Sequence, residues 1–229
     1  MKDPYVYDGT DVLKNLGGFK KQEDLDEFES AMFKLAFINM NNNDYQIEKI
    51  EDLFEIHRIV FSNVYEWAGK PRKINIYKTE KVLNGLSVNY SDYNNIKKDI
   101  KELNIDFNKV KPSNNVQGLI KEIALLISKI WRVHAFREGN TRAIGIFLYF
   151  WMKKLNIKLN SDFLGKNAKY FRNALVLASI DEYSEYEHLE NILIDAMNIT
   201  NDSTISDKYK SIKGYDLKNY KYNYHHIKE

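Results

Sequence analysis

The chain has 229 residues, of which 44% are hydrophobic and 14% aromatic, so it has enough apolar material for a sizeable core and is not a disordered chain. Its 34 basic and 32 acidic side chains nearly cancel, which excludes steering by net charge to nucleic acid or to an anionic membrane. The absence of cysteine excludes disulfides, cysteine-bound zinc and thiolate nucleophiles. We expect one domain with at most a small appendage, and no nucleic-acid or membrane partner.

The amino terminus has no apolar stretch of the kind found in secretory signals. No apolar run approaches the roughly 20 residues that cross a bilayer, and the densest one, 144–152, lies inside a longer helical pattern. These features predict a cytoplasmic protein.

Apolar residues recur with the spacing of amphipathic helices along most of the chain, and only three prolines interrupt it, so the expected fold class is all-α. A more polar surface helix is expected over 94–107. The apolar stripes expected to face the core are Phe28, Met32, Leu35 and Ile38; Ile47, Ile50, Phe54 and Val60; Val116, Leu119, Ile123, Ile127 and Ile130; Ile144, Phe147, Leu148 and Trp151; Phe171, Leu175 and Ala178; and Leu189, Leu193 and Met197.

One segment, about 72–90, departs from the helical pattern. Polar and apolar residues alternate over 73–77 and again over 86–90, and Asn84 and Gly85 between them are typical of a tight turn. This pattern predicts a β-hairpin, which we call the flap. Because an isolated hairpin is marginally stable in water, the flap should lean on the helical body.

The segment from His134 to Arg142, the catalytic loop, lies between two predicted helices and combines several residues with chemical potential. Asn140 is a favoured N-cap for a helix that starts at Thr141, and Gly139 permits backbone angles that other residues resist. The amides of a helix amino terminus bind anions, phosphate above all, and Arg142 in the first turn can add a charged contact.

Two further side chains complete the pattern. Glu138 beside an anion site is best explained if a cation lies between the two, and Mg²⁺ on phosphate oxygens needs such a ligand. His134 titrates near neutrality and can accept a proton. Taken singly, each residue is more simply a capping or packing residue; together they suit the attack of a hydroxyl on a nucleotide phosphate.

The catalytic loop resembles the signature of the Fic (Fido) family, His-x-Phe-x-(Asp/Glu)-Gly-Asn-(Gly or Thr)-Arg-x-x-Arg. The resemblance extends to residues 3–15 and 56–72 and covers about residues 1–198, which leaves 199–229 as a Tyr- and Lys-rich extension. It implies a helical bundle with one hairpin flap. The residues that carry the signature are His134, Phe136, Glu138, Gly139, Asn140, Thr141 and Arg142.

The resemblance implies a protein adenylyltransferase, which transfers AMP from ATP to a Ser, Thr or Tyr hydroxyl of a target protein and of itself, with Mg²⁺ as cofactor. A small antitoxin or a second copy of the chain would be a further partner. The implied roles are proton removal by His134, anchoring by Phe136, Mg²⁺ binding by Glu138, phosphate binding by Gly139, Asn140, Thr141 and Arg142, and target docking by strand addition at Ile74, Asn75 and Ile76 of the flap.

The chain departs from the family pattern at three points. Ala135 replaces the usual proline, Gly145 replaces the second arginine, and no inhibitory (Ser/Thr)-x-x-x-Glu-(Gly/Asn) motif matches. Two alternatives therefore stay open: a transferase of the same fold that uses another nucleotide, phosphocholine or phosphoryl donor, and a catalytically silent nucleotide-binding regulator.

The other candidates have simpler interpretations. His57 lies on an apolar helix stripe and is expected to be a hydrogen-bonded core histidine, and the tryptophans Trp67, Trp131 and Trp151 are expected in the core. The tyrosines and lysines of the extension could form a nucleic-acid patch, but its acidic residues favour an extension that folds over the body or is partly ordered.

Overall fold

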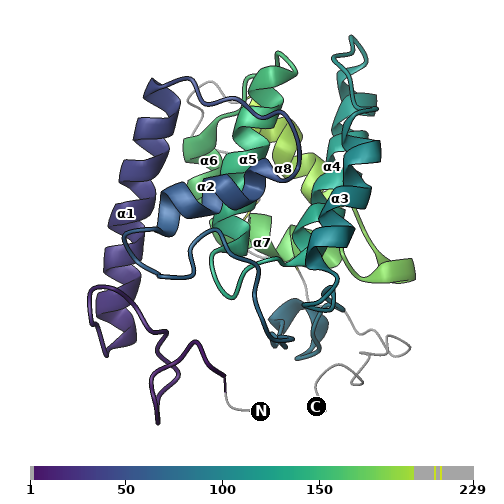
Figure 1. Ribbon diagram of the computed structural model, residues 1–229. Helices are drawn as coiled ribbons and strands as arrows, with labels where there is room; N and C mark the ends of the chain where they lie inside the picture. Colours follow the sequence, from purple (N-terminus) through teal and green to yellow (C-terminus); the bar gives the residue numbers. More distant parts are fainter. Residues whose placement is uncertain (1–2, 199–208, 210–211, 213–229) are drawn as a thin grey trace.

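The computed structural model describes residues 3–198, 209 and 212. Within them the chain forms eight α-helices and no β-strand; the only bridge is an isolated antiparallel pair, Val6 and Leu13. Figure 1 colours the helices along the chain, with α1 along one edge and α5 near the centre. They are α1 (Gln22–Asn42), α2 (Asp52–Phe61), α3 (Ile96–Phe107), α4 (Val116–Val133), α5 (Asn140–Lys154), α6 (Ser161–Lys166), α7 (Ala168–Leu177) and α8 (Glu187–Asn198).

The core is organised around α4 and α5. Helix α4 contacts α3, α5, α7 and α8, while α5 contacts α2 as well as α4. Every residue of α5 from Ile146 to Met152 except Tyr149 is buried, so this apolar run lies inside the bundle. No helix among the described residues is both long and apolar enough to cross a membrane.

The predicted helices are confirmed in type and approximate place, but the expected stripe of α1 is wrong in its second half. Leu35 and Ile38 were expected in the core and are 55% and 54% exposed. The face of α1 that packs on the body includes a buried acidic residue, Glu29, which the apolar pattern could not reveal. The buried residues of α1 are Leu25, Glu29, Ala36 and Met40.

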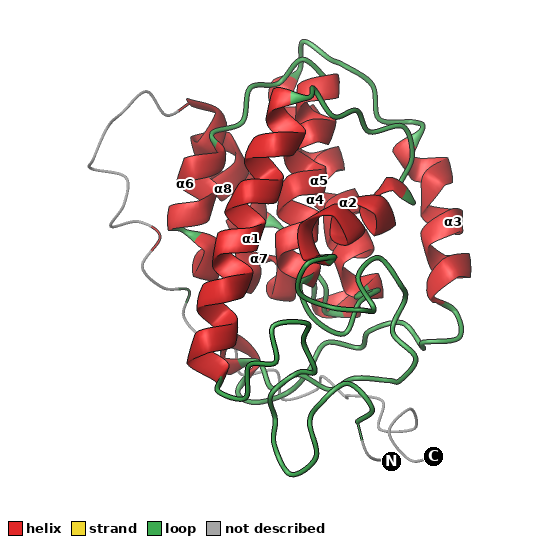
Figure 2. Cartoon of the chain, turned by 60° about the vertical axis from the view of Figure 1, so that its left-hand side comes forward, coloured by secondary structure: helices red, strands yellow, loops and turns green. Residues whose placement is uncertain are grey.

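The flap does not form the predicted hairpin ladder. Asn84 and Gly85 have positive φ angles of 51° and 91°, so the chain reverses at the predicted turn. The Glu80 amide donates to the Leu86 carbonyl at 3.0 Å across this turn, but two residues further out the Lys78 amide donates to the side chain of Ser87, at 3.2 Å from Oγ. The flap is therefore a loop with one 3-10 turn, Lys81–Leu83, and Figure 2 shows it among the loops at one end of the bundle.

The extension at 199–229 lies outside the described residues except at Tyr209 and Ile212, which are both buried. The Tyr209 ring packs against Phe163 and Tyr170, with centroid distances of 5.5 and 4.6 Å. Its hydroxyl donates to the Asp195 carboxylate on α8.

Candidate active site

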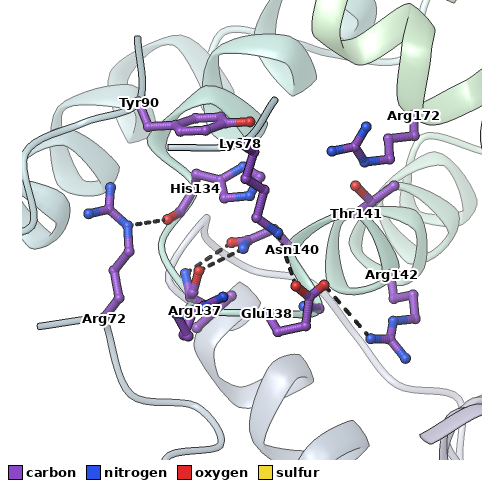
Figure 3. A network of polar contacts seen from close by, with 12 residues as sticks. Arg72, Lys78, Tyr90, His134, Arg137, Glu138, Asn140, Thr141, Arg142 and Arg172 are labelled. Carbon is purple, nitrogen blue, oxygen red and sulfur yellow. Dashed lines mark hydrogen bonds and ion pairs between the residues drawn. The ribbon is translucent and has the colours of Figure 1, made fainter. Parts of the chain in front are cut away.

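The catalytic loop joins the end of α4 to the start of α5, as the sequence predicts. Helix α4 ends at Val133, and His134 adopts left-handed backbone angles of φ 49° and ψ 56°. A non-glycine residue in this region is uncommon and is often part of a functional site. Figure 3 shows that the turn brings His134 close to the flap residues Lys78 and Tyr90.

A pocket of about 340 Å³ opens where the catalytic loop meets the amino terminus of α5. It brings together His134 and all five residues from Glu138 to Arg142, which the sequence singled out. It also includes residues from the flap and from α7 that sequence reasoning missed, because only the fold brings them to the signature. These additional residues are Lys78, Ala168, Lys169 and Arg172.

His134 is almost completely buried, at 2% exposure, and its ring contacts two aromatic rings. Tyr90 covers it at a centroid distance of 4.1 Å, and Trp131 meets it edge-on at 5.0 Å. Neither ring nitrogen has a hydrogen-bond partner within the described part of the chain. Burial, with smaller contributions from the charges of Lys78, Arg72 and Arg172, lowers the pKa of His134 well below its usual value. The imidazole is therefore neutral at pH 7 and able to accept a proton.

Glu138 is an ionised carboxylate surrounded by donors. Its Oε2 atom lies 3.0 Å from the Lys78 ammonium, and its Oε1 atom accepts from the Gly139 amide at 2.9 Å. Burial acts to raise its pKa, but Lys78, the Gly139 bond and the charge of Arg142 outweigh burial and lower the pKa to about 2. No group of three metal-ligating side chains occurs among the described residues. Glu138 is a carboxylate of the pocket that could hold Mg²⁺ together with the oxygens of a bound phosphate.

The amino terminus of α5 differs from the prediction by one residue. Asn140 was expected to cap a helix starting at Thr141, but the helix starts at Asn140 and Gly139, at φ 80°, is the cap residue. The Asn140 side chain instead closes the catalytic loop, accepting from the Phe136 amide at 2.9 Å and donating to the Phe136 carbonyl at 2.7 Å. The loop bond leaves the Asn140 side chain unavailable to a phosphate, whereas the first main-chain amides of the helix keep their capacity to bind one.

Thr141 and Arg142 are likewise tied to other helices. Thr141 Oγ1 accepts from the Trp131 indole at 3.0 Å. The Arg142 guanidinium, expected to contact a phosphate, lies 2.7 Å from the buried carboxylate of Glu29 on α1, which also accepts from the Tyr65 hydroxyl. Because breaking a buried ion pair costs about 3–5 kcal/mol, Arg142 should present its remaining N–H groups to the pocket without leaving Glu29.

The residues on either side of the signature also have defined places. Gly145 lies one turn after Arg142, outside the pocket lining. The cations of the α7 wall are Lys169 and Arg172, and both Nη atoms of Arg172 donate to the buried carboxylate of Glu80 in the flap, at 2.6 and 2.7 Å. Arg172 therefore connects α7 to the flap.

The flap residues expected to dock a target do not line the pocket. Ile74 is half-buried, Ile76 is buried, and the Asn75 side chain donates to Asp92 at 2.9 Å. These side chains serve mainly to hold the flap on the body, so only the main chain of this segment would pair with another strand.

Two buried side chains hold the catalytic loop from outside the signature. Arg72 donates from its amide to the Ala135 carbonyl at 2.8 Å and from Nε to the His134 carbonyl at 2.9 Å. His57 is buried and hydrogen-bonded, as predicted, but one of its partners is the carbonyl of Glu138 at 3.0 Å. Burial lowers the pKa of His57 to about 3, so its ring is neutral.

Comparison with known proteins agrees with this architecture. Residues 47–152 match the model of the Fic/DOC family. A curated relative, the probable protein adenylyltransferase y4lH of Sinorhizobium fredii, is 29% identical over 180 residues, which cover 77% of this chain and 88% of the relative. The protein adenylyltransferase VbhT of Bartonella schoenbuchensis is 25% identical over 84% of this chain, but the match spans only 38% of VbhT. Residues 47–152 are thus a Fic domain.

Solved structures show the same fold. The Fic domain of Bep8 from Bartonella sp. 1-1C superposes with a TM-score of 0.70 at 19% identity, covering 85% of this chain and 94% of that chain. BepC from Bartonella tribocorum, crystallised with bound AMPPNP, gives a TM-score of 0.67 at 21% identity and covers 84% of this chain and 95% of that chain. At these identities the likeness establishes the helical fold around the catalytic loop.

Proposed function

We propose that this protein is a protein adenylyltransferase that transfers AMP from ATP to a Ser, Thr or Tyr hydroxyl of a target protein and of itself. The observation that carries the proposal is the pocket, in which a neutral, unpartnered His134 and an ionised Glu138 flank the amino terminus of a helix. Such a pocket pairs a proton acceptor with a binding site for phosphates.

In this reaction the oxygen of the acceptor hydroxyl forms a bond to the α-phosphorus of ATP. The bond from that phosphorus to the bridging oxygen breaks, and pyrophosphate leaves. His134 takes the hydroxyl proton, because its ring is neutral and its nitrogens have no hydrogen-bond partner within the described residues. The first amides of α5, with Lys78, Arg142 and the α7 cations, would bind the phosphates and neutralise their charge.

Glu138 is the residue that would hold Mg²⁺, because its ionised carboxylate lines the pocket beside the α5 amino terminus. Bound there, Mg²⁺ would neutralise phosphate charge. Lys78 now pairs with this carboxylate and would exchange that contact for a phosphate oxygen.

The relatives support the same activity. Both y4lH and VbhT are named as protein adenylyltransferases, and the fold neighbour BepC was crystallised with an ATP analogue. By the same analogy, residues 1–198 would act as the catalytic unit with 199–229 as an extension. We also propose that the main chain of Ile74–Ile76 pairs with the target, and that a small antitoxin or a second copy of this chain is a further partner.

The test is transfer itself. The full chain is incubated with α-labelled ATP and Mg²⁺, alone and with a cell lysate, and the modified hydroxyl is identified by mass spectrometry. We expect AMP on the chain and on a target protein. As a control, the His188→Ala variant removes a histidine that bonds to Tyr170 on the far side of α7 and should label like the parent chain.

Parallel incubations with GTP, UTP and CDP-choline address the other reactions open to the fold. A product formed only from one of these donors would replace ATP in the proposal. Absence of any product, together with tight ATP binding by calorimetry, would instead identify a silent nucleotide-binding regulator.

A further inference from the structure

His57 lies on α2, far in sequence from the catalytic loop, yet both of its ring nitrogens are engaged next to that loop. The Gly69 amide donates to Nδ1 at 2.9 Å, and Nε2 lies 3.0 Å from the Glu138 carbonyl oxygen. An amide can only donate and a carbonyl can only accept, so the two partners together define the tautomer. Nδ1 is the acceptor, and Nε2 carries the proton that it donates to Glu138.

This bond determines the orientation of the Glu138–Gly139 peptide group. In a trans peptide the carbonyl and the following N–H point in opposite directions, and the chain contains no cis peptide among the described residues. Anchoring the Glu138 carbonyl on His57 therefore turns the Gly139 N–H away from α2. There it meets the Glu138 carboxylate at 2.9 Å, in the wall of the pocket.

Packing strengthens the same constraint. The His57 ring stacks on Phe136, the buried anchor of the loop, with a centroid distance of 3.7 Å and an interplanar angle of 22°. A side chain at Gly139 would place its Cβ 2.5 Å from the Phe61 ring and 3.3 Å from His57 Nε2. The loop thus lies directly against α2, with Gly139 close to both Phe61 and His57.

We propose that His57 is a positioning residue for the reaction: its Nε2–H bond orients the Glu138–Gly139 peptide so that the Gly139 amide and the Glu138 carboxylate face the nucleotide. The proposal rests on the proposed function for the identity of the nucleotide. It requires no contact between His57 and substrate. Because a misplacement of about 1 Å can cost about 10²-fold in rate, loss of this bond should have a large effect on turnover.

The primary test compares two variants that both weaken packing on Phe136. His57→Phe keeps an aromatic ring but removes both hydrogen bonds. Phe54→Leu removes another ring that packs on Phe136, at a centroid distance of 5.5 Å, and leaves the loop hydrogen bonds intact. We expect His57→Phe to lower kcat about 10²-fold. The same variant should lose the additional rise in Tm that the parent chain shows when Mg²⁺ is present together with AMPPNP. Phe54→Leu should keep kcat within about twofold of the parent chain.

Equal losses of kcat in the two variants at equal loss of Tm would show that His57 acts only through packing and would overturn the proposal. His57→Gln, which can donate to Glu138 and accept from Gly69, should recover part of the lost kcat. If neither His57 variant folds, nitrogen NMR of the histidine rings in the parent chain tests the proposed tautomer of His57. A protonated Nε2 with a hydrogen-bonded proton is expected, and a protonated Nδ1 contradicts the proposal. If the parent chain transfers no nucleotide, the proposed function fails, while the NMR and AMPPNP measurements still test the role of His57.

Discussion

The catalytic loop and the flap meet at the same pocket, but different interactions hold them. The catalytic loop is fixed by hydrogen bonds between its main chain and buried side chains, those of His57, Arg72 and Asn140. The flap packs apolar residues such as Val82 and Leu83 into the core, and its contacts at the pocket are charged pairs, Lys78 with Glu138 and Glu80 with Arg172.

This difference in the type of contact indicates which part of the site should respond to ligands. Hydrogen bonds to buried main-chain groups are insensitive to salt and hold the loop in a single conformation. Charged pairs at the edge of a pocket can exchange partners when a polyanion enters, because phosphates compete for the same cations. We therefore expect a preformed catalytic loop beneath a flap that rearranges on binding.

The largest expected effect comes from removing the proton acceptor of the catalytic loop. His134→Ala should reduce AMP transfer by about 10²–10⁴-fold, the usual range for loss of a general base. Because His134 has no hydrogen-bond partner within the described residues, nucleotide affinity measured by calorimetry should change little. Transfer at the parent rate would show that another group takes the proton.

Acid should destabilise the folded chain through the two buried histidines of the site. The pKa values of His57 and His134 lie below 6.5 in the folded protein, so the unfolded chain binds more protons and the free energy of unfolding falls as pH decreases from 6.5 to 5. The loss should reach about 2 kcal/mol per histidine at pH 5. Urea titrations across this range check it, and His57→Phe should remove about half of the slope. Stability that stays constant over this range would mean that the buried rings bind protons in the folded state.

Arg72 connects the two regions, since it also donates to the carbonyls of Ile74 and Ser91 at the ends of the flap. Arg72→Met would leave several buried carbonyls unpaired and should cost about 3 kcal/mol of unfolding free energy in urea. Arg72→Lys should recover only part of this, because an ammonium lacks the planar fork. Full recovery by lysine would reduce the role of Arg72 to its charge.

Loss of the flap pair should have a smaller effect. Glu80→Gln keeps the shape of the side chain but removes the charge opposite Arg172, whose side chain is 35% exposed. Solvent screening at Arg172 reduces the expected loss to about 2 kcal/mol. A double-mutant cycle with Arg172→Gln measures the pair directly, and additive losses would mean that the two side chains do not interact.

The smallest effect concerns the absent second arginine. With Gly145 in its place, ADP should bind within tenfold of ATP, a difference below about 1.4 kcal/mol, as measured by calorimetry. A larger preference for ATP would mean that another cation of the pocket binds the γ-phosphate, and Lys169→Ala then tests one candidate. Without an inhibitory motif, the isolated chain should also modify itself slowly in ATP and Mg²⁺.

Local patterns in the sequence were sufficient to predict the helices and the signature. The 3.6-residue period marked α1, α2, α4, α5, α7 and α8, α3 was expected as a more polar helix, and the turn at Asn84 and Gly85 was predicted correctly. The short helix α6 was missed, because its six residues are too few to show a period. His134 and Glu138 could be identified because chemically active residues stand close together along the chain.

The rest was decided by contacts between distant segments. Nothing local indicates that Glu29 is buried against Arg142, or that Lys78 and Arg172 complete the pocket, because an ion pair across the fold has no sequence period. For the same reason the alternating flap could not be distinguished from a hairpin. Its main chain finds partners such as the Tyr5 hydroxyl, which accepts from the Lys73 amide at 3.0 Å, only once the body is folded.

The role of His57 shows most clearly what the sequence determines and what the tertiary structure determines. The sequence by itself determined that this histidine lies on the apolar side of a helix and must be hydrogen-bonded there, since burial of an unpaired polar group is costly. Only the tertiary structure decided that the partner is the Glu138 carbonyl, because α2 and the catalytic loop come together where Gly139 meets Phe61 and where Phe136 stacks on His57. The chemical type of a side chain is a local property of the sequence. The geometry that allows His57 to orient the catalytic loop depends on two segments about 80 residues apart.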